Sequence, residues 1–357
     1  MCTIGELITK VGSGVTPRGG EAVYKTEGHP FVRSQNVGLG NLLLDDIAFI
    51  DEETHLRQKN TELQFNDVLL NITGASIGRS ALVDKQIVGG NVNQHVCIIR
   101  TKENLVPSFI CSFLLSNYGQ RQIDSFQAGG NRQGLNFEQI KSIKITIPSK
   151  DEQIKIAKLL RAIDERIATQ NKIIDKLQSL IKGVAQNVAR NNKPNIRLSE
   201  CLECSSSTLQ ESDVCKNGTY PVYGANGIVG YLDNYNTEKE AVYIIKDGSG
   251  VGTVSYVTGK CSATGTLNTL QAKEGYSLQY LYYMLKVFNF EPYKTGMAIP
   301  HIYFKDYGKA KIFCPSYTEQ LKYARLLSAI DNKLSAEQSI LTDLSLQKQY
   351  LLRQMFI

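Results

Sequence analysis

What this 357-residue sequence lacks excludes several classes of protein. No stretch approaches the roughly 20 apolar residues of a membrane-spanning helix, so we expect no membrane contact. The segment Met1 to Glu6 lacks the basic start and the apolar run of a signal peptide. The eight cysteines have no close, regular spacing, which suits a reducing compartment better than a disulfide framework. We therefore expect a cytoplasmic protein.

Motifs of nucleotide-using enzymes are missing as well. No Gly-x-x-x-x-Gly-Lys-Ser/Thr sequence occurs, which argues against a P-loop nucleotidase. The glycines at 248, 250 and 252 have the wrong spacing for a dinucleotide-binding fingerprint. The nine prolines contain no adjacent pair, so the Asn-Pro-Pro-Tyr signature of an amino-methyltransferase is absent. These absences argue against a nuclease or methyltransferase fused to another module.

The strongest feature that is present is an internal repeat. Pro148-Ser149 is followed by Glu-Gln and then by Leu-Leu-x-Ala-Ile-Asp, which ends at Asp164, and the same pattern runs from Pro315-Ser316 to Asp331. The offset of 167 residues (315 − 148) also places Phe137 on Phe304 and Lys144-Ile145 on Lys311-Ile312. Such a repeat indicates one supersecondary unit used twice, so we interpret the chain as two copies of one module.

Each copy of the repeat predicts a long helix. Ser149-x-x-Glu152 and Ser316-x-x-Glu319 are capping boxes, and the proline before each serine disfavours helix upstream. Apolar residues then recur with the 3.5-residue period of a coiled coil. The apolar positions are Leu160, Ile163, Ile167, Ile174, Leu177, Ile181, Val184 and Val188, and then Leu327, Ile330, Leu334, Leu341, Leu344, Leu351 and Met355.

The few polar residues in these two apolar seams suggest how the helices pair. Gln170 and Glu337 occupy the same position in the two copies, and Lys348 is a second polar member of the later seam. We predict an antiparallel pair about a pseudo-twofold axis, with Gln170 and Glu337 meeting near the axis and fixing the register. A parallel pair would also bring equivalent positions together. The other interpretation is that each helix simply covers its own domain.

The remaining sequence predicts two globular modules that mix strands and helices. Both contain short β-type runs separated by glycine, asparagine and serine, at 67–72, 94–99 and 241–245. Both have a late helical stretch, at 107–118 and 277–288. The predicted class is α+β, with the two modules joined by the two long helices. The segments are 1–148 (first module), 149–190 (first helix), 191–315 (second module) and 316–357 (second helix).

Metal binding is not indicated by the histidines or the cysteines. Cys201-x-x-Cys204, together with Cys215 and Cys261, could be drawn as a zinc site. A comparison of the two module starts, however, places Cys201 on Leu7, an apolar helix position, where cysteine acts as a small hydrophobic residue. The four histidines show no spacing typical of metal ligands: His29, His55, His95 and His301. We predict no metal site.

The loops between the β runs are rich in residues that can contact DNA. Asparagine, glutamine, arginine, serine and threonine read base edges, and glycine lets the backbone approach phosphates. The formal net charge of +6 permits a nucleic-acid partner without establishing one. The same residues are also ordinary turn formers, and composition alone favours that interpretation.

In its repeat and its loops, the chain resembles the DNA-specificity (S) subunit of type I restriction–modification systems. The residues that carry the resemblance are the segments 147–164 and 314–331, supported by the loops at 71–78, 218–227 and 246–252. The resemblance implies two target-recognition domains that alternate with two antiparallel spacer helices. Each domain would read one half of a bipartite, asymmetric DNA site, and the helices would set the gap between the halves.

The resemblance also implies the partners. They would be double-stranded DNA, two modification subunits that carry S-adenosylmethionine and methylate adenine, and restriction subunits that use ATP and Mg²⁺. The chain itself would hold no cofactor and perform no catalysis. The alternative from another class is a non-catalytic coiled-coil scaffold whose two lobes bind proteins, and it predicts no sequence-specific DNA affinity even when partner subunits are present.

We select DNA-contacting candidates from the loops on the basis of side-chain type. In the first module they are Arg33, Gln35, Asn36, Thr73, Ser76, Arg79, Asn91, Asn93, Gln94, Arg132, Gln133 and Asn136. In the second module they are Tyr223, Asn226, Lys246, Ser249, Thr253, Thr264, Asn268, Lys294, His301 and Tyr303.

Overall fold

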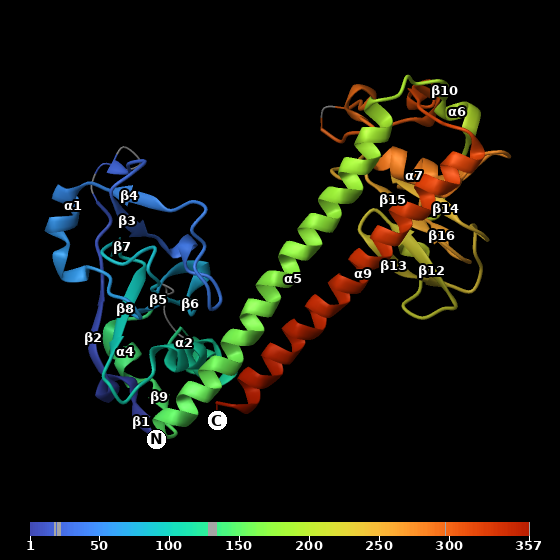
Figure 1. Ribbon diagram of the computed structural model, residues 1–357. Coiled ribbons are helices and arrows are strands. Elements are labelled where there is room, and N and C mark those ends of the chain that lie inside the picture. The colour runs from blue at the N-terminus through green and yellow to red at the C-terminus, as the bar shows by residue number, and fades with distance from the viewer. Residues whose placement is uncertain (18, 20–22, 128–133, 297, 357) are drawn as a thin grey trace. The chain divides into compact units, whose positions relative to one another are not determined.

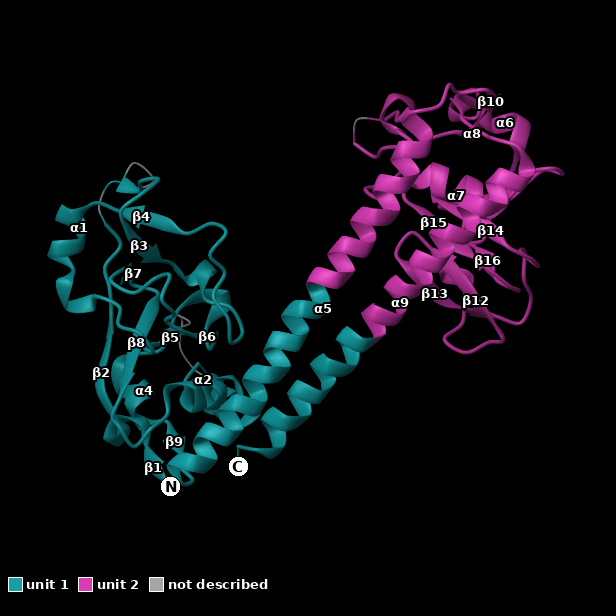
Figure 2. Cartoon of the chain, in the orientation of Figure 1, with its two compact units in different colours: residues 1–171, 340–357 teal, residues 172–339 magenta. Residues whose placement is uncertain are grey.

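The computed structural model describes residues 1–17, 19, 23–127, 134–296 and 298–356. The chain forms two compact units, of which unit 1 comprises residues 1–171 and 340–357 and unit 2 comprises residues 172–339 (Figure 2). The division passes through both long helices, α5 (Lys150–Arg190) and α9 (Tyr317–Gln354). The four segments predicted from the sequence keep each helix whole, and that division stays a prediction.

Unit 1 contains three small sheets, with strand orders β2-β8-β5-β6, β4-β3-β7 and β1-β9 (Figure 1). The first sheet is antiparallel throughout, whereas β3 pairs antiparallel with β4 and parallel with β7. The strands are β1 (Cys2–Thr3), β2 (Ile8–Ser13), β3 (His29–Val32), β4 (Ala48–Ile50), β5 (Val68–Asn71), β6 (Ser80–Leu82), β7 (Asn91–Val92), β8 (Val96–Thr101) and β9 (Lys144–Ile145). The short helices are α1 (Glu52–Arg57), α2 (Pro107–Leu115), α3 (Asn117–Ser125) and α4 (Phe137–Ser142).

Unit 2 repeats these three sheets strand for strand, with orders β11-β17-β14-β15, β13-β12-β16 and β10-β18. The strands are β10 (Ile196–Arg197), β11 (Leu202–Ser206), β12 (Tyr220–Gly224), β13 (Gly227–Leu232), β14 (Ala241–Ile245), β15 (Val254–Val257), β16 (Ser262–Ala263), β17 (Leu267–Ala272) and β18 (Lys311–Ile312). The short helices are α6 (Leu198–Cys201), α7 (Leu278–Lys286) and α8 (Phe304–Tyr307). The internal repeat therefore covers the whole of both modules, and the predicted α+β class is confirmed.

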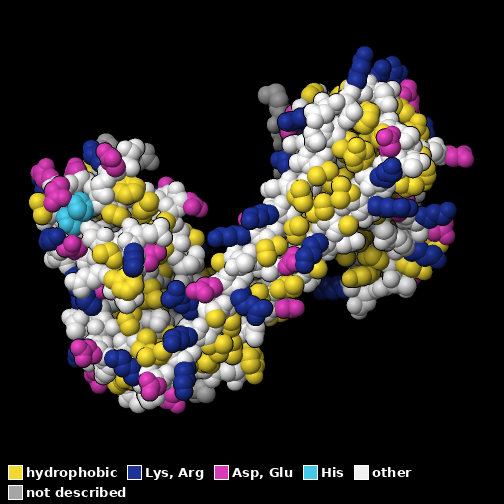
Figure 3. Space-filling view, viewed as in Figure 1, with side chains coloured by type: hydrophobic (Ala, Val, Ile, Leu, Met, Phe, Trp, Pro, Cys, Tyr) yellow, Lys and Arg dark blue, Asp and Glu magenta, His cyan; other side chains and the backbone are white. Residues whose placement is uncertain are grey.

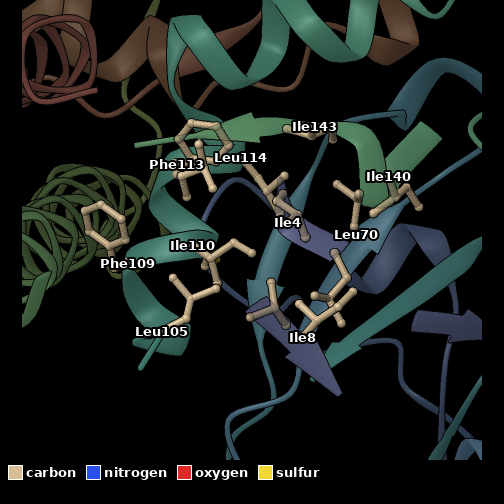
Figure 4. Close-up of a cluster of buried hydrophobic side chains, with 14 of the residues drawn as sticks. Ile4, Ile8, Leu70, Leu105, Phe109, Ile110, Phe113, Leu114, Ile140 and Ile143 are labelled. Carbon is tan, nitrogen blue, oxygen red and sulfur yellow. The ribbon is translucent and has the colours of Figure 1, made fainter. Parts of the chain in front are cut away.

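The main core of unit 1 lies between the four-stranded sheet and α2 (Figure 4). Leu70 from β5 and Ile110 and Leu114 from α2 are fully buried there. Phe356, just beyond α9, belongs to the same core, and its ring centroid lies 5.2 Å from that of Phe109. The end of α9 thus completes the interior of a module that is otherwise built from residues 1–171.

The two long helices run antiparallel within unit 1. Lys348 Nζ near the end of α9 lies 2.5 Å from Asp164 Oδ1 near the start of α5. Leu160 of α5 belongs to the core, and Leu351 of α9 packs against it. The predicted capping box at the start of α5 is present, because the Ser149 amide donates to Glu152 Oε2 at 3.1 Å and the Glu152 amide donates to Ser149 Oγ at 3.4 Å.

The predicted seam residues of both helices are buried or half-buried. Gln170 and Glu337 are among the buried ones. They belong to different units, so their predicted meeting stays a prediction. The helix predicted at 107–118 is interrupted: Ser116 is extended, with ψ of 160°, and its hydroxyl caps α3 by accepting from the Gly119 amide.

Cys201 lies in α6 and is fully buried, as expected from its alignment with Leu7, which is also buried. Its thiol donates to the Leu198 carbonyl at 3.4 Å. Within the described ranges, no three histidine, cysteine, aspartate or glutamate side chains are grouped as a metal site would require. In the same part of the chain, no helix is long and apolar enough to span a membrane.

Candidate nucleic-acid interface

Loops that are far apart in the sequence of unit 1 meet beyond the ends of β3 and β5. Asn71 Nδ2 donates to the Ser34 carbonyl at 2.8 Å. The Ile72 amide donates to the His95 carbonyl at 3.0 Å, and the Leu135 amide donates to the Ile72 carbonyl at 2.8 Å. We call the segments 33–36, 71–79, 93–95 and 134–136 the first loop face.

Unit 2 brings its corresponding loops together through the same kind of bonds. The Lys246 amide donates to the Thr266 carbonyl at 3.0 Å, and the Ile302 amide donates to the Lys246 carbonyl at 2.9 Å. The Thr264 amide donates to the Tyr223 carbonyl at 2.9 Å. We call the segments 223–226, 246–253, 264–266 and 301–303 the second loop face.

The longest loops of the two faces have the same backbone structure. In unit 1 the Asn71 amide donates to the Arg79 carbonyl at 2.8 Å, and in unit 2 the Ile245 amide donates to the Thr253 carbonyl at 3.0 Å. Gly78 and Gly252 precede the last residue of each loop, with φ of 85° and 91°. A side chain is strained at such φ values, so both positions require glycine. The loops 73–79 and 247–253 are therefore equivalent.

The sequence-selected candidates differ in exposure. The exposed ones are Gln35, Arg79, Gln94, Asn136, Asn226, Ser249, Thr253 and Tyr303. The half-buried ones are Arg33, Thr73, Ser76, Tyr223, Lys246, Lys294 and His301. The buried ones are Asn36, Asn91, Asn93, Thr264 and Asn268. Arg132 and Gln133 lie outside the described residues.

The buried candidates hold the module together, and we no longer count them as groups that contact bases. Asn36 Nδ2 donates to the Leu43 carbonyl at 2.9 Å, and Asn91 Nδ2 donates to the Gln58 carbonyl at 2.9 Å. Asn268 Nδ2 donates to the hydroxyl of Tyr307 at 3.2 Å. Moving such an amide to a base edge would leave its buried partner unsatisfied, which costs about 1–3 kcal/mol per group.

Some exposed or half-buried candidates also have internal partners. Asn136 caps α4, because its Oδ1 accepts from the Gln139 amide at 2.8 Å. Gln94 Oε1 accepts from the Thr16 amide at 3.3 Å. Each of these two hydrogen bonds uses one lone pair of the amide oxygen, so the side chains keep further donors and acceptors for a ligand.

The cations among the candidate residues fall into two groups. Arg33 donates to the Asp46 carbonyl at 2.7 Å and pairs with its carboxylate at 3.2 Å, and Lys294 pairs with Glu291 at 2.6 Å. Among the described residues, no carboxylate lies within ion-pair distance of Arg79 or Lys246. Basic, acidic and hydrophobic side chains are interspersed over the visible surface (Figure 3). The loop faces thus offer individual cations rather than a continuous basic surface.

A histidine contacts the first residue of each equivalent loop. Thr73 Oγ1 lies 2.5 Å from His95 Nδ1, and Asp247 Oδ1 lies 2.7 Å from His301 Nδ1. The two histidines lie at non-equivalent places in the fold, because His95 precedes strand β8 whereas His301 precedes helix α8. His95 and Asp247 were not selected from the sequence, although each is next to a selected residue, Gln94 and Lys246 respectively. The contact partner is a long-range feature that side-chain type does not reveal.

Tyr223 contributes an aromatic hydroxyl to the second loop face. Burial raises the pKa of this phenol, and the nearby Cys261 raises it further. The hydroxyl therefore stays protonated at neutral pH and can both donate and accept a hydrogen bond. Its ring packs against that of Tyr243 with centroids 5.7 Å apart.

Comparison with known proteins agrees with this architecture. Residues 1–179 and 194–345 match the family described as "Type I restriction modification DNA specificity domain". The chain belongs to this family, and the resemblance inferred from the repeat is confirmed. The two matched stretches cover the two modules and most of both long helices. The chain is accordingly a specificity protein and not the catalytic component of a restriction–modification system.

Individual relatives carry the same description. The chain is 25% identical over 320 residues to a putative type I specificity subunit of Mycoplasma genitalium, covering 82% of this chain and 81% of the relative. It is 22% identical to the EcoKI specificity subunit of Escherichia coli, covering 51% of this chain and 39% of the relative.

A solved structure shows the same fold. The crystal structure of a type I restriction–modification system S subunit from M. genitalium matches with a TM-score of 0.70 at 20% identity, covering 99% of this chain and 95% of that one.

Proposed function

We propose that this chain reads a bipartite, asymmetric DNA site, with the first loop face reading one half and the second loop face reading the other. The observation that carries the proposal is the pair of equivalent loops with unlike side chains. The shared backbone hydrogen bonds hold the loop residues in equivalent positions in both units. The residues that differ, such as Arg79 and Thr253, present different chemistry to DNA. Two readers of this kind recognise two unlike half-sites.

The two long helices would set the gap between the halves. A helix rises about 1.5 Å per residue, so a helix of the length of α9, which has 38 residues, spans about 57 Å. Such an element is stiff enough to separate two reading surfaces by a fixed distance. Half-sites recognised by paired domains are typically one helical turn of DNA apart, about 34–36 Å, or a multiple of it.

The partners would be two modification subunits and, through them, restriction subunits. Two surface features support a pair of equivalent docking sites. Leu159 in α5 and Leu326 in α9 occupy equivalent positions of the repeat and are 45% and 51% exposed. Two copies of one partner would contact equivalent positions of a repeat, so an exposed leucine at the same position in both copies fits that role.

Catalytic cofactors would belong to those partners. S-adenosylmethionine would be held by the modification subunits, and ATP and Mg²⁺ by the restriction subunits, so this chain would direct adenine methylation without taking part in it. A target adenine must leave the base stack to be methylated, which requires an enzyme pocket on another subunit. All eight cysteines are free in the structure, which supports a cytoplasmic location for the complex.

The test is to co-express this chain with the modification subunit encoded beside it and to map methylated adenines across the host genome by single-molecule sequencing. The expected result is one motif with two unlike halves and a fixed gap. A control that expresses the modification subunit alone should show no such motif.

A stable complex that binds its cofactor but methylates no motif would contradict the proposal. That result would favour the alternative in which the two modules are lobes of a scaffold that bind proteins. The control identifies methylation that does not depend on this chain.

A further inference from the structure

The equivalent loops 73–79 and 247–253 hold their last residue in the same way. The Arg79 amide donates to the Ser76 carbonyl at 3.2 Å, while the Arg79 carbonyl accepts from the Asn71 amide at 2.8 Å. The Thr253 amide donates to the Gly250 carbonyl at 3.0 Å, while its carbonyl accepts from the Ile245 amide at 3.0 Å. Both residues are therefore fixed by backbone hydrogen bonds on the two sides of their Cα atoms, and each immediately precedes a strand, β6 or β15.

In unit 1, a side chain of α3 also holds the loop in place. Gln120 Nε2 of α3 donates to the Gly78 carbonyl at 3.0 Å. A Cβ atom added to Gly78 would lie 2.6 Å from Gln120 Oε1, so the backbone passes close to this side chain. A rigid support of this kind positions a reading side chain more accurately than a free loop does. Arg79 stands on that support.

Arg79 also has the chemistry of a base-reading group. Its side chain is exposed, and no ion pair or hydrogen bond neutralises it within the described ranges. Arg33, on the same loop face, is instead neutralised by Asp46 and lies 5.4 Å from the ring of Tyr24. An arginine guanidinium presents two parallel N–H groups that match O6 and N7 of guanine, whereas threonine lacks this fork.

We propose that Arg79 reads a guanine in the first half-site and that Thr253 occupies the equivalent reading position for the second half-site. This inference rests on the proposed function and adds part of the target sequence to it. The two positions determine specificity through the same backbone geometry. The difference between the half-sites at this point then follows from a single side chain.

The experiment uses methylation mapping of the co-expressed complex with single substitutions. Arg79→Ala removes the fork, and Arg79→Gln replaces it with an amide that pairs with adenine. Thr253→Arg places the fork on the other unit. Arg57→Ala is the matched control, because Arg57 is an exposed arginine of the same unit that lies in α1, outside the segments of the first loop face, and pairs with Glu53.

The expected results differ by variant. Arg79→Ala should lower the preference for one guanine about 10- to 100-fold while leaving the other half of the motif unchanged. Arg79→Gln should shift that position toward adenine. Thr253→Arg should add a guanine requirement to the other half. The Arg57→Ala motif should equal that of the wild type. Thermal unfolding of each variant should match the wild type because these side chains are exposed.

Two outcomes would overturn the inference. One is an unchanged motif in Arg79→Ala. The other is a uniform loss of methylation at all sites in both Arg79 variants, with the motif unchanged, because this pattern describes a phosphate contact. A wild-type complex without any motif contradicts the proposed function itself, and it is recognised before any variant is made.

Discussion

The two units share one sheet topology, but their contacts with the long helices differ. The repeated motif places Asp164 in α5 and Asp331 in α9 at equivalent positions (331 − 164 = 167). Asp164 pairs with Lys348 of the other long helix at 2.5 Å, and the same ammonium donates to the Leu39 carbonyl at 3.3 Å. Asp331 instead accepts from the hydroxyl of Tyr283 in α7 at 3.3 Å.

This difference shows which part of a repeat sets the fold. The backbone topology and the position of the aspartate are the same in both units, while the partner changes from a charged to a neutral group. Lys348 connects α9 to α5 and to Leu39, which follows segment 33–36 of the first loop face. Tyr283 joins only a module helix to α9. Unit 1 should therefore depend on its helix contacts more strongly than unit 2.

The largest expected effect comes from removing the aromatic residue that only unit 1 has at its helix end. Phe356→Ala should lower the free energy of unfolding of unit 1 by about 3 kcal/mol, because Phe356 packs in its core. The equivalent position in unit 2 is Ala189 (356 − 167). Calorimetry should resolve an earlier transition for unit 1, while Tyr350→Ala, at a side chain that is 62% exposed, should change little. Equal destabilisation of both units would contradict the comparison.

The two aspartate contacts should differ in strength. Lys348→Met leaves Asp164 without its cation, in a pair whose side chains are 17% and 36% exposed, and should cost about 1–2 kcal/mol after allowance for solvent. Asp331→Asn changes the charge of a group bonded to a hydroxyl and should cost about 0.5 kcal/mol. Urea unfolding measures both, with hydrogen exchange assigning the loss to a unit. A larger effect for Asp331→Asn would reverse the order.

Acid should weaken unit 1 through its hydrogen-bonded carboxylates. Five carboxyl groups of unit 1 accept hydrogen bonds that lower their pKa values. They are Glu6, Asp51, Glu52, Glu62 and Glu152, and their donors are, in the same order, Thr3, Thr54, His29, Lys59 and Ser149. A lowered folded-state pKa contributes stability that is present above the unfolded pKa of about 4 and is lost as pH falls through the folded value.

Hydrogen exchange at pH 6 and pH 3.5 tests this expectation. Protection of unit 1 should fall between the two values, and the double variant Glu6→Gln, Glu152→Gln should show a smaller fall. If the double variant loses as much protection as the wild type, these carboxylates are not the source of the pH dependence.

The smallest effect concerns thiol reactivity. Burial raises the pKa of Cys97 to about 12 and that of Cys111 to about 11, so their thiolate populations at neutral pH are very small. Cys215 in unit 2 is exposed. Peptide mapping after brief maleimide treatment of the native protein should find the label on Cys215 before Cys97 or Cys111. Earlier labelling of either buried thiol would indicate that the core of unit 1 opens readily.

Local patterns in the sequence were sufficient to predict the long helices. A capping box, a preceding proline and a 3.5-residue apolar period are short-range signals, and the structure places α5 and α9 where they indicate. The strand predicted at 241–245 coincides with β14. Its signal is also local, a short run of apolar and aromatic residues, and all five of these residues are buried. The repeat of the helical motif also predicted that the modules would be equivalent.

The loop faces required the structure because their parts are joined by long-range pairing. Nothing in the sequence near Thr73 indicates that Gly134 will lie beside it, or that Asp247 will meet His301. Side-chain type also fails to separate a reading amide from a structural one. Asn91 and Asn226 are the same residue, yet the first is fully buried and bonded to the backbone while the second is exposed in the turn between β12 and β13.

The place of Phe356 in the core of unit 1 has a consequence for protein synthesis. A ribosome adds about 5–20 residues per second, and Phe356 follows the end of the first segment of unit 1 by 185 residues (356 − 171). The first module therefore leaves the ribosome about 10–40 s before the residue that completes its core is made. During this interval its apolar interior next to Phe109 is open to solvent, to chaperones and to neighbouring nascent chains.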